Sequence, residues 1–546
     1  MYLSDPVEGR RPWILRLPSV RDSLLQSRQM INATARRCHI FSLALLLGFS
    51  CFVRAQSGDP IHFRITLAPE LGKARQSGRL LIFLSSSTKA EKELRPGFGA
   101  EAQSVWITAR EVTGLQPGGS ADVYGNEISY PAPLAQAPAG DYQAMALLDV
   151  SHHYVYAKNS TGDPRSAVVL LKQLDPAHSG AVELTLSERT EETPIKVEPP
   201  NEMLDFVSPA LSAFWGRSIH IRGVIVFPPH YKTSTKLYPT VYWTHGFGAT
   251  LRPIAERIAP RYAQSMASGE LPPMIYVLLD ESCPGGTHEF ADSVNNGPWG
   301  KALTTELIPY LEKKYRMQRR PSGRLLTGHS SGGWAALWLQ VAYPGVFGGT
   351  WPTSPDPSDF RNFTGPNLRS NPPDNLYHDA AGKPWPLVRM DGKEVMTIEE
   401  YARQERVLGD YGGQFNSFNW VFSPRAKDGR PESIVDLDTG EVNPEVAMAW
   451  EKYDIAEVLR KNVARFRPLL QNKIHLTVGT ADTFHLDESA RLLEATLKEL
   501  GIKATFTYLP GKTHFDLYKD GLGKQIGKEM EETAERGMPA KPSTRR

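Results

Sequence analysis

The hydrophobic and polar positions of this chain follow two different rhythms. Between residues 61 and 186, short alternating apolar runs are separated by turn-forming stretches rich in glycine and proline. Such runs, without a long helical pattern between them, predict a β-sandwich, which we place at 56–187. Adjacent His152 and His153 would point to opposite faces of a strand, so we expect no metal site there. The strands are expected at 61–67, 80–84, 144–150 and 182–186.

A charged, proline-rich stretch at 188–216 predicts a linker, and a different pattern begins after it. From 217 to 523, short apolar runs alternate with stretches in which apolar residues recur every three or four positions. Strands alternating with helices predict an α/β fold, a mostly parallel sheet doubly wound by helices on both faces. The strands are expected at 219–227, 240–244, 274–279, 324–327, 348–351, 474–478 and 504–508, and the helices at 254–266, 301–315, 333–342 and 487–500.

Residues 353–450 interrupt this alternation and are rich in glycine, proline, aspartate, asparagine and aromatic residues. We interpret them as one long cap inserted after the fifth strand. Within the cap, Phe418 and Trp420 belong to a run that interleaves aromatic rings with amides, as a site for a sugar or an aromatic acyl group would. The same residues would also serve as the cap's own core, and the sequence leaves both readings open. The charged tail, 524–546, is expected to be frayed.

The first 55 residues read as a leader. Two arginines precede the apolar run 39–53, and small residues lead into a polar stretch at residue 56. This order predicts a secretory signal peptide at about 30–55, and hence a secreted or periplasmic protein with no membrane attachment after cleavage. At about 14 residues the run is short for a membrane span, which needs roughly 20. An uncleaved anchor and a lipid anchor at Cys51 are the alternatives.

Charge and cysteine content narrow the partners and the source of stability. The net charge is +2, and the leader alone carries an excess of five positive charges, which leaves about −3 for the rest. Nucleic acid is therefore not expected as a partner. Two of the three cysteines lie in the leader, so Cys283 alone remains and no internal disulfide can form. Packing in a large core must supply the stability, and we read Cys283 as a small apolar loop residue.

The motif Gly-His-Ser-Ser-Gly at 328–332 stands between the strand expected at 324–327 and the helix expected at 333–342. Five-residue matches arise by chance, so the motif alone is a weak signal and its position carries the argument. A strand, a sharp turn and a helix form a nucleophile elbow, in which glycines relieve the crowding around a strained serine. We therefore predict that Ser330 is a catalytic nucleophile.

A serine hydroxyl needs a base, and the base needs a carboxylate that orients it. Asp482 and His514 each follow the end of an expected strand, in the chain order Ser, Asp, His that belongs to α/β hydrolases. The carboxyl ends of parallel strands meet at one edge of a sheet, so both residues should lie beside Ser330. Of their rivals, we expect His485 to serve its loop and Asp487 to cap a helix.

Catalysis by such a serine also needs hydrogen-bond donors fixed in advance for the oxyanion. The turn that begins with His245 and Gly246 follows an early strand, and it predicts the backbone N–H of Phe247 as one donor. The backbone N–H of Ser331, the residue after the nucleophile, would be the other. We place His245 and Gly246 at the substrate side of this turn, with a hydrogen-bonding role for His245. This chemistry needs no metal and no cofactor.

With these residues in view, the region from about 217 to 520 resembles the esterase family that includes feruloyl and acetylxylan esterases, S-formylglutathione hydrolases, enterochelin esterases and mycolyltransferases. The resemblance implies the α/β-hydrolase fold and a metal-independent acyl-enzyme mechanism on an ester or thioester. The long cap departs from the family and removes any basis for copying a substrate pocket. The matching stretches are 242–248, 290–293, 306–309, 328–333, 479–482 and 511–514.

The sequence therefore predicts a secreted serine esterase acting on acyl groups of carbohydrate, aromatic or siderophore esters. An acyltransferase would use the same residues with an alcohol in place of water. A serine peptidase of this fold usually carries a far longer propeller domain. A protein that chiefly binds glycan or siderophore through its β-sandwich is the remaining alternative.

Overall fold

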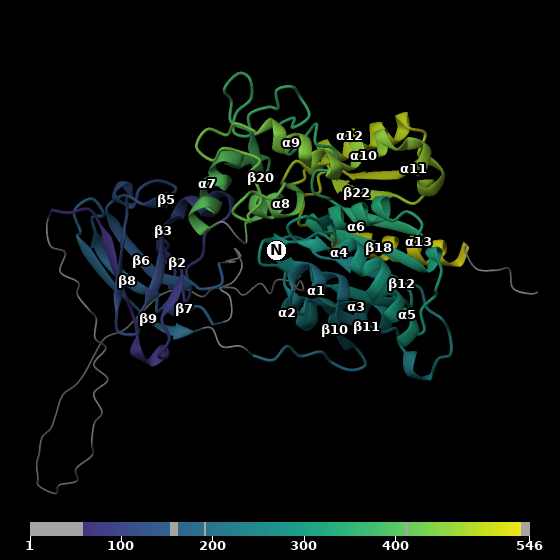
Figure 1. Cartoon of the computed structure of the whole chain (residues 1–546), viewed down its shortest axis with the longest axis horizontal. Coiled ribbons are helices and arrows are strands. Elements are labelled where there is room, and N and C mark those ends of the chain that lie inside the picture. The colour runs from purple at the N-terminus through teal and green to yellow at the C-terminus, as the bar shows by residue number, and fades with distance from the viewer. Residues whose placement is uncertain (1–57, 153–161, 190–192, 410–412, 537–546) are drawn as a thin grey trace, which may run out of the picture. The chain divides into compact units, whose positions relative to one another are not determined.

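The computed structural model describes residues 58–152, 162–189, 193–409 and 413–536 (Figure 1). The expected signal peptide lies outside the described residues, as do Cys51 and His153. No helix among the residues described here combines the length and the apolar character needed to cross a membrane.

The N-terminal part is a β-rich domain, as the sequence predicts. Its nine strands are hydrogen-bonded into one connected sheet in the order β4-β1-β9-β7-β6-β2-β3-β5, with β8 paired to β6. Apolar side chains from alternate positions, such as Phe63, Ile65 and Ile82, form its core. All four expected strands are present. The strands are β1 (His62–Leu67), β2 (Gln76–Ser85), β3 (Val105–Leu115), β4 (Ser120–Tyr124), β5 (Ile128–Tyr130), β6 (Gly140–Asp149), β7 (Pro164–Ser166), β8 (Val169–Leu174) and β9 (Ala181–Arg189).

The second part is built on an eight-stranded sheet in the order β10-β11-β13-β12-β18-β19-β22-β23. The first two strands are antiparallel to their neighbours, and all pairs from β13 to β23 are parallel. All seven strands expected from the sequence are present. The strands are β10 (Glu202–Val207), β11 (His220–Val226), β12 (Thr240–Thr244), β13 (Ile275–Leu279), β18 (Arg324–His329), β19 (Gly349–Thr353), β22 (His475–Gly479) and β23 (Thr505–Leu509).

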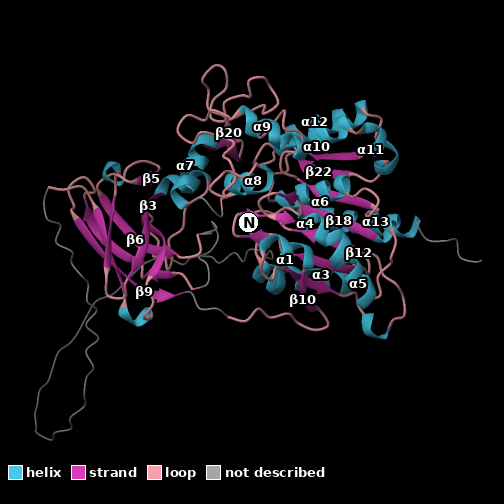
Figure 2. Cartoon of the chain, viewed as in Figure 1, coloured by secondary structure: helices cyan, strands magenta, loops and turns pink. Residues whose placement is uncertain are grey.

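Helices cover both faces of this sheet, because successive strand residues point to opposite sides (Figure 2). Tyr242 packs into one buried cluster and its neighbour Val241 into another on the opposite face. The four expected helices are present, two of them with a π-helical segment in the middle. The helices are α2 (Leu251–Pro253), Ile254–Ile258 and α3 (Ala259–Ala267); α4 (Trp299–Ala302), Leu303–Leu307 and α5 (Ile308–Lys314); α6 (Ser331–Ala342); α10 (Ile455–Lys461); α11 (Val463–Leu470); and α12 (Leu486–Glu499).

Two segments that the sequence predicts to be irregular contain regular elements of the fold. The expected linker, 188–216, contains strand β10 and helix α1 (Pro209–Trp215), and β10 forms the edge of the large sheet. The expected frayed tail contains α13 (Leu522–Arg536), which buries Ile526 and Met530 against the sheet. In both segments charged residues interrupt the apolar pattern, while spacings of two along the strand and four along the helix still line up one buried face.

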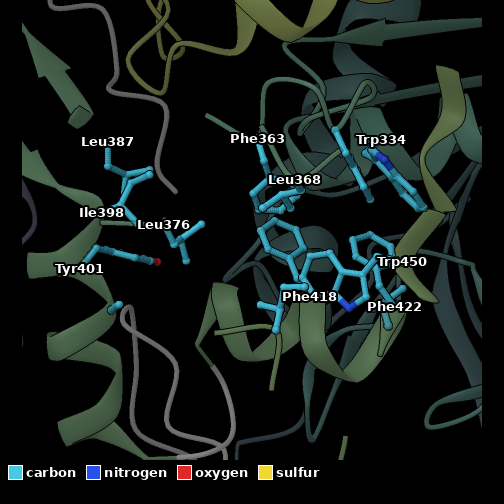
Figure 3. Packing of buried hydrophobic residues seen from close by; sticks show 14 of the residues in the cluster. Trp334, Phe363, Leu368, Leu376, Leu387, Ile398, Tyr401, Phe418, Phe422 and Trp450 are labelled. Atoms are coloured by element: carbon cyan, nitrogen blue, oxygen red, sulfur yellow. The ribbon is translucent and has the colours of Figure 1, made fainter. Parts of the chain in front are cut away.

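The inserted cap follows β19, and its apolar side chains belong to a buried cluster that also includes residues of α6 and of the β-rich domain (Figure 3). The cap contains a two-stranded hairpin and three helices. Phe418 and Phe422 stack on each other, and Phe422 packs edge-on against Trp450 and tilted against Trp334 of α6. The cap elements are β20 (Pro386–Met390), β21 (Lys393–Thr397), α7 (Ile398–Leu408), α8 (Gln414–Phe422) and α9 (Pro444–Trp450).

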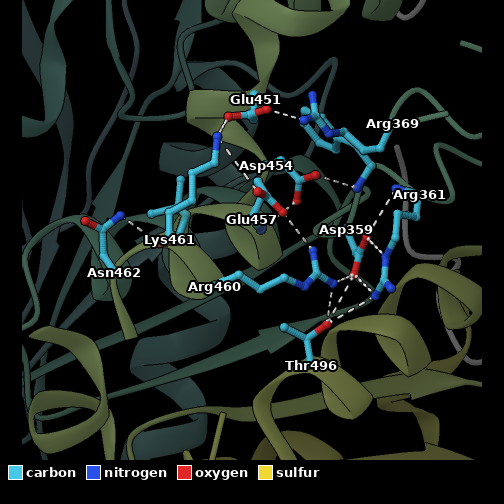
Figure 4. A network of polar contacts seen from close by, with 12 residues as sticks. Asp359, Arg361, Arg369, Glu451, Asp454, Glu457, Arg460, Lys461, Asn462 and Thr496 are labelled. Carbon is cyan, nitrogen blue, oxygen red and sulfur yellow. Dashed lines mark hydrogen bonds and ion pairs between the residues drawn. The ribbon is translucent and has the colours of Figure 1, made fainter. Parts of the chain in front are cut away.

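Polar contacts fix the cap at both of its sides. Where the cap begins, fully buried Asp359 accepts hydrogen bonds from the guanidinium groups of Arg361 and Arg460 (Figure 4). At the end of α7, Arg79 of β2 donates hydrogen bonds to the carbonyl oxygens of Arg406 and Val407, at 2.9 and 2.8 Å. The cap is therefore tied both to the α/β core and to the β-rich domain.

Candidate active site

Ser330 lies at the sharp turn between β18 and α6. Its backbone adopts φ 60° and ψ −129°, a conformation that costs a non-glycine residue about 1–3 kcal/mol. The turn is held by hydrogen bonds from the Ser330 N–H to the carbonyl of Thr353 and from the Trp334 N–H to the carbonyl of Ser330, both 3.0 Å. The Ser330 side chain remains half-exposed. This is the geometry of a nucleophile elbow.

Close backbone approaches explain the glycines of the motif. A Cβ atom on Gly328 would lie 2.1 Å from the carbonyl oxygen of Gly332, and one on Gly332 would lie 2.4 Å from that of Thr244. The Thr244 hydroxyl also contacts the Gly332 carbonyl oxygen at 2.6 Å. The strained turn therefore depends on strand β12, and larger residues at these positions would force the elbow apart.

Asp482 and His514 meet, as the sequence predicts, at the carboxyl ends of β22 and β23. The Nδ1 atom of His514 lies 3.1 Å from Oδ2 of Asp482, and the exposed fractions are 2% and 0%. The two loops run side by side, since the Ala481 N–H donates to the Lys512 carbonyl at 3.0 Å. The His514 ring also lies 4.4 Å from the ring of His329, centre to centre, which places it at the elbow.

The charge states around this pair are set by their surroundings. Burial alone would raise the pKa of Asp482, but the charge of His514, the hydrogen bond to its ring and the Phe484 N–H outweigh it, so the pKa lies below its usual range. Burial, with the nearby His514, lowers the pKa of His329 to about 3. Asp482 is therefore an ionised carboxylate beside His514, while His329 is a neutral ring that contacts it.

The turn after β12 brings Gly246 against the elbow, since a Cβ atom there would lie 3.2 Å from Cβ of Ser330. His245 is 1% exposed and braces the turn from behind. The Glu281 N–H donates to its Nε2 at 2.7 Å, so Nδ1 carries the proton that is donated to the Gly246 carbonyl at 2.8 Å. His245 thus has the hydrogen-bonding role expected of it, but its burial contradicts the prediction that it lies on the substrate side of the turn. Phe247 is partly buried.

Ser331 begins α6, and its side chain connects the elbow to the cap. Its hydroxyl donates to Oδ2 of Asp356 at 2.7 Å, and Nε2 of Gln414, the first residue of α8, donates to the same oxygen at 3.1 Å. Both Ser331 and Asp356 are buried. The backbone of Ser331 is therefore anchored from two sides.

The two aromatic residues expected to bind substrate occupy different places. Phe418 is 6% exposed and belongs to the cap core, where it packs against Phe363 and Phe422, so the structure favours the core reading for it. Trp420 is half-buried and covers Gly285, whose Cβ would lie 2.6 Å from its ring. Of the two rings, that of Trp420 is the more exposed.

The rival residues have other partners. Nε2 of His485 lies 3.2 Å from a carboxylate oxygen of Glu394, so the ring of this histidine contacts the cap hairpin, whereas we expected it to serve its own loop. Asp487 lies in the first turn of α12, near Arg491. Burial raises the pKa of Cys283 to about 12, so its thiol stays protonated and is no nucleophile at neutral pH.

Comparison with known proteins agrees with this geometry. Residues 212–525, more than half of the chain, match the model of the family described as "Putative esterase". The chain belongs to this family. It has the α/β-hydrolase fold.

Individual relatives are distant. Over 138 residues the chain is 26% identical to the uncharacterized protein YbbA of Bacillus subtilis; the match covers 23% of this chain and spans about half (53%) of that curated relative. A ferulic acid esterase aligns over 62% of this chain and 100% of its own, with 15% identity and a TM-score of 0.38. The serine hydrolase FphF of Staphylococcus aureus aligns over 60% of this chain and 97% of its own, with 14% identity and a TM-score of 0.37. An S-formylglutathione hydrolase of Agrobacterium tumefaciens aligns over 62% of this chain and 95% of its own, with 15% identity and a TM-score of 0.36.

Reasoning from the sequence missed several residues that the structure brings to the site. Asp356, Gln414, Glu281 and Glu289 lie in loops or in the cap, outside any motif. Asp356 and Glu281 lie just past the ends of β19 and β13, and cap helix α8 contacts Asp356 through Gln414. The position of His329 within the motif was the one available signal, since it directly precedes Ser330.

Proposed function

We propose that Ser330 attacks the ester carbonyl carbon while His514 accepts the hydroxyl proton. Asp482 orients His514 and stabilises its positive charge, and the backbone N–H groups of Phe247 and Ser331 donate to the oxyanion. The alcohol leaves with the proton from His514. Water, activated by the same histidine, then releases the acid and restores the serine.

One observation supports this proposal above the others. A strained, half-exposed serine lies at the carboxyl end of the sheet, and a buried Asp482–His514 pair reaches the same elbow from the next strands. Strain at a functional turn is kept only where the surrounding structure holds it in place. Here Thr353, Trp334 and the close packing on β12 do so.

The direct test is Ser330→Ala with a short nitrophenyl ester as substrate. Loss of the nucleophile should lower kcat by about 10⁶-fold, because the members of a triad act as a unit. A fluorophosphonate probe should label wild-type protein at Ser330 and leave the variant unlabelled. A variant that folds, by circular dichroism, and still hydrolyses the ester at the original rate would refute the proposal.

The substrate and the location of the enzyme extend the same proposal. Acetyl, feruloyl and siderophore esters form the first panel, since the family resemblance names these classes. The ring of Trp420 is partly exposed, and this residue is the one that we propose contacts such a group. Residues 30–55 support export to the periplasm or the medium, which fractionation of cells carrying the full chain would test.

A further inference from the structure

Three buried carboxyl groups gather beside the nucleophile elbow, under the first turn of cap helix α8. They belong to Glu281, Glu289 and Asp356, which are 0%, 0% and 4% exposed. We call this group the acidic recess. None of these side chains takes part in the proposed acyl transfer, so their presence next to the reacting centre needs a separate explanation.

Direct contacts place Asp356 and Glu289 under one face of α8. Gln414 donates to Asp356, and one turn later the Ser417 hydroxyl lies 3.0 Å from the hydroxyl of Thr287. The Thr287 hydroxyl in turn donates to Glu289 at 3.5 Å. Residues three apart on a helix lie about 5–6 Å from each other. Asp356 also receives the Ser331 hydroxyl, so this side of the recess borders the nucleophile directly.

Glu281 approaches from the other side, through the short hairpin of β14 (Ser282–Cys283) and β15 (Gly286–Thr287). The His288 N–H donates to the carbonyl of Glu281 at 3.1 Å, which pairs the two residues across the hairpin and sets Glu289 next to this pair. The Glu281 N–H holds His245, which holds Gly246 against Ser330. The acidic recess therefore combines side chains from the segment after β13, from the hairpin and from the segment after β19.

Three carboxyl oxygens of this recess lack hydrogen-bond partners among the described residues. Among the described residues, none hydrogen-bonds to Oε1 or Oε2 of Glu281, to Oε2 of Glu289 or to Nε2 of the equally buried His288. Native proteins leave few buried polar atoms unpaired, and each such atom calls for a ligand, a water or a function. Four of them in one place, beside a nucleophile, point to a group that enters with the substrate.

The electrostatic surroundings agree. Burial and neighbouring carboxylates raise the pKa of Glu281 to about 8 and that of Glu289 well above its usual value. Burial also raises the pKa of Asp356 to about 6. The charged groups that act most strongly on these three carboxyls are other carboxylates and histidines; no arginine or lysine is among the strongest. A positive charge would relieve all three groups at once.

We propose that the acidic recess receives a positively charged group of the substrate, an ammonium or guanidinium, while Ser330 attacks the ester beside it. Such a group supplies the donors that the unpaired oxygens lack and the charge that the cluster lacks. No bond to the cation forms or breaks; ester and water still give acid and alcohol. A metal ion fits less well, since no set of three or more ligating side chains suited to one occurs in the described part of the chain.

The proposal rests on the proposed esterase function, and paired esters test it on both sides of the scissile bond. For the acyl side, the pair is nitrophenyl 6-aminohexanoate and nitrophenyl heptanoate. For the alcohol side, it is the acetate of 2-(trimethylammonio)ethanol and that of 3,3-dimethylbutanol. Each pair differs in charge and hardly in shape. In at least one of the two pairs, the wild-type protein should have a kcat/KM about tenfold or more higher for the cationic ester than for the neutral one, as expected for a charge bound near buried carboxylates.

Variants connect that preference to the recess. Glu281→Gln and Glu289→Gln keep the size of the side chain and remove its charge, so the ratio of cationic to neutral kcat/KM should fall to about threefold or less. Glu445→Gln, on the exposed first turn of α9, is the matched control and should keep the wild-type ratio. A ratio that stays high in both recess variants would overturn the proposal.

A measurement on wild-type protein guards against variants that do not fold. Butylammonium and tetramethylammonium should inhibit hydrolysis of the neutral ester competitively, and neopentyl alcohol at the same concentration should not. Hydrolysis of the neutral esters with no preference in either pair would overturn the recess and leave the esterase function intact. No hydrolysis of any ester, together with no fluorophosphonate labelling of Ser330, would overturn both.

Discussion

Two groups of buried carboxyls lie within reach of the same serine, and they differ in their partners. Asp482 is fully buried and receives His514 and the Phe484 N–H, and its pKa is lowered. Glu281 is just as buried, lacks a hydrogen-bond partner for its carboxyl oxygens among the described residues, and its pKa is raised. Burial penalises both charges equally, so the difference comes from the donors that the fold provides. The fold provides hydrogen-bond donors for the carboxylate of Asp482 and none for that of Glu281 among the described residues.

The difference between the two carboxyls distinguishes a pair that is complete without a ligand from a group that is complete only when a ligand binds. The Asp482–His514 pair is complete before any ligand arrives, as preorganised catalysis requires. The acidic recess stays incomplete until a group enters it. Residues of the second kind usually cost stability, because binding and folding place different demands on the same side chain.

The largest expected effect comes from removing the charge of the Asp482 carboxylate. Asp482→Asn should lower kcat by about 10⁴-fold with little change in structure, since an amide at this position favours the wrong tautomer of His514. The measurement is kcat on a nitrophenyl ester, with folding checked by circular dichroism. Asp487→Asn, the same change in the next helix, should retain most of the activity. Similar losses in both variants would show that Asp482 has no special role.

A second change would separate the Asp482–His514 pair without altering its chemistry. A Cβ atom on Gly479 would lie 2.0 Å from the Lys512 carbonyl oxygen, so Gly479→Ala should push the Asp482 and His514 loops apart. We expect about a 10²-fold loss of kcat and about 1–3 kcal/mol of stability. Thermal unfolding and kcat would be measured together. Gly345→Ala is the control, because a Cβ atom there meets no neighbour within 4 Å; an unaffected Gly479→Ala would contradict the close packing of the loops.

Stability against pH should distinguish the two carboxyls by sign. The pKa of Glu281 is raised in the fold, so its contribution is present at low pH and is lost as pH rises from about 4.5 to about 8. Glu281→Gln should therefore gain about 1–3 kcal/mol over wild type at pH 8–9 and little at pH 5. The pKa of Asp482 is lowered, so Asp482→Asn should lose stability at neutral pH instead. Urea unfolding at pH 5, 7 and 9 would measure the free energy of unfolding of both variants. A difference from wild type that is the same at every pH would refute the opposite signs expected for Glu281 and Asp482.

The smallest effect is expected at His329, which contacts the Asp482–His514 pair without titrating near neutrality. Its ring lies against His514, and its Nδ1 lies 3.0 Å from the Thr353 hydroxyl, a hydrogen bond that an asparagine can replace. His329→Asn should change kcat/KM by less than about tenfold. Because the pKa of His329 is about 3, the pH profile between 5 and 8 should keep its shape. A shifted acid limb would assign that limb to His329.

The sequence allowed the reacting centre to be predicted but not its surroundings. Ser330, Asp482 and His514 could be found because each directly follows a strand of a parallel sheet, and chain order alone then brings them to one edge. Asp356 and Glu281 follow strands β19 and β13 just as closely, but no motif marks them, and the sequence does not show that cap helix α8 contacts Asp356. In the same way, β10 and α13 were hidden because charged residues on their exposed faces dilute the apolar pattern.

The packing of α8 on the β14–β15 hairpin has a consequence for how the protein opens. A Cβ atom on Gly285 would lie 2.6 Å from Trp420, and one on Gly286 would lie 2.7 Å from Ser417. The side chains of α8 and the backbone of the hairpin are packed so closely here that α8 cannot slide along the hairpin. The amide hydrogens of α8 should then exchange with solvent as slowly as those of strand β12, in a single cooperative event. In thermodynamic terms, the insertion has become part of the folding unit that it interrupts.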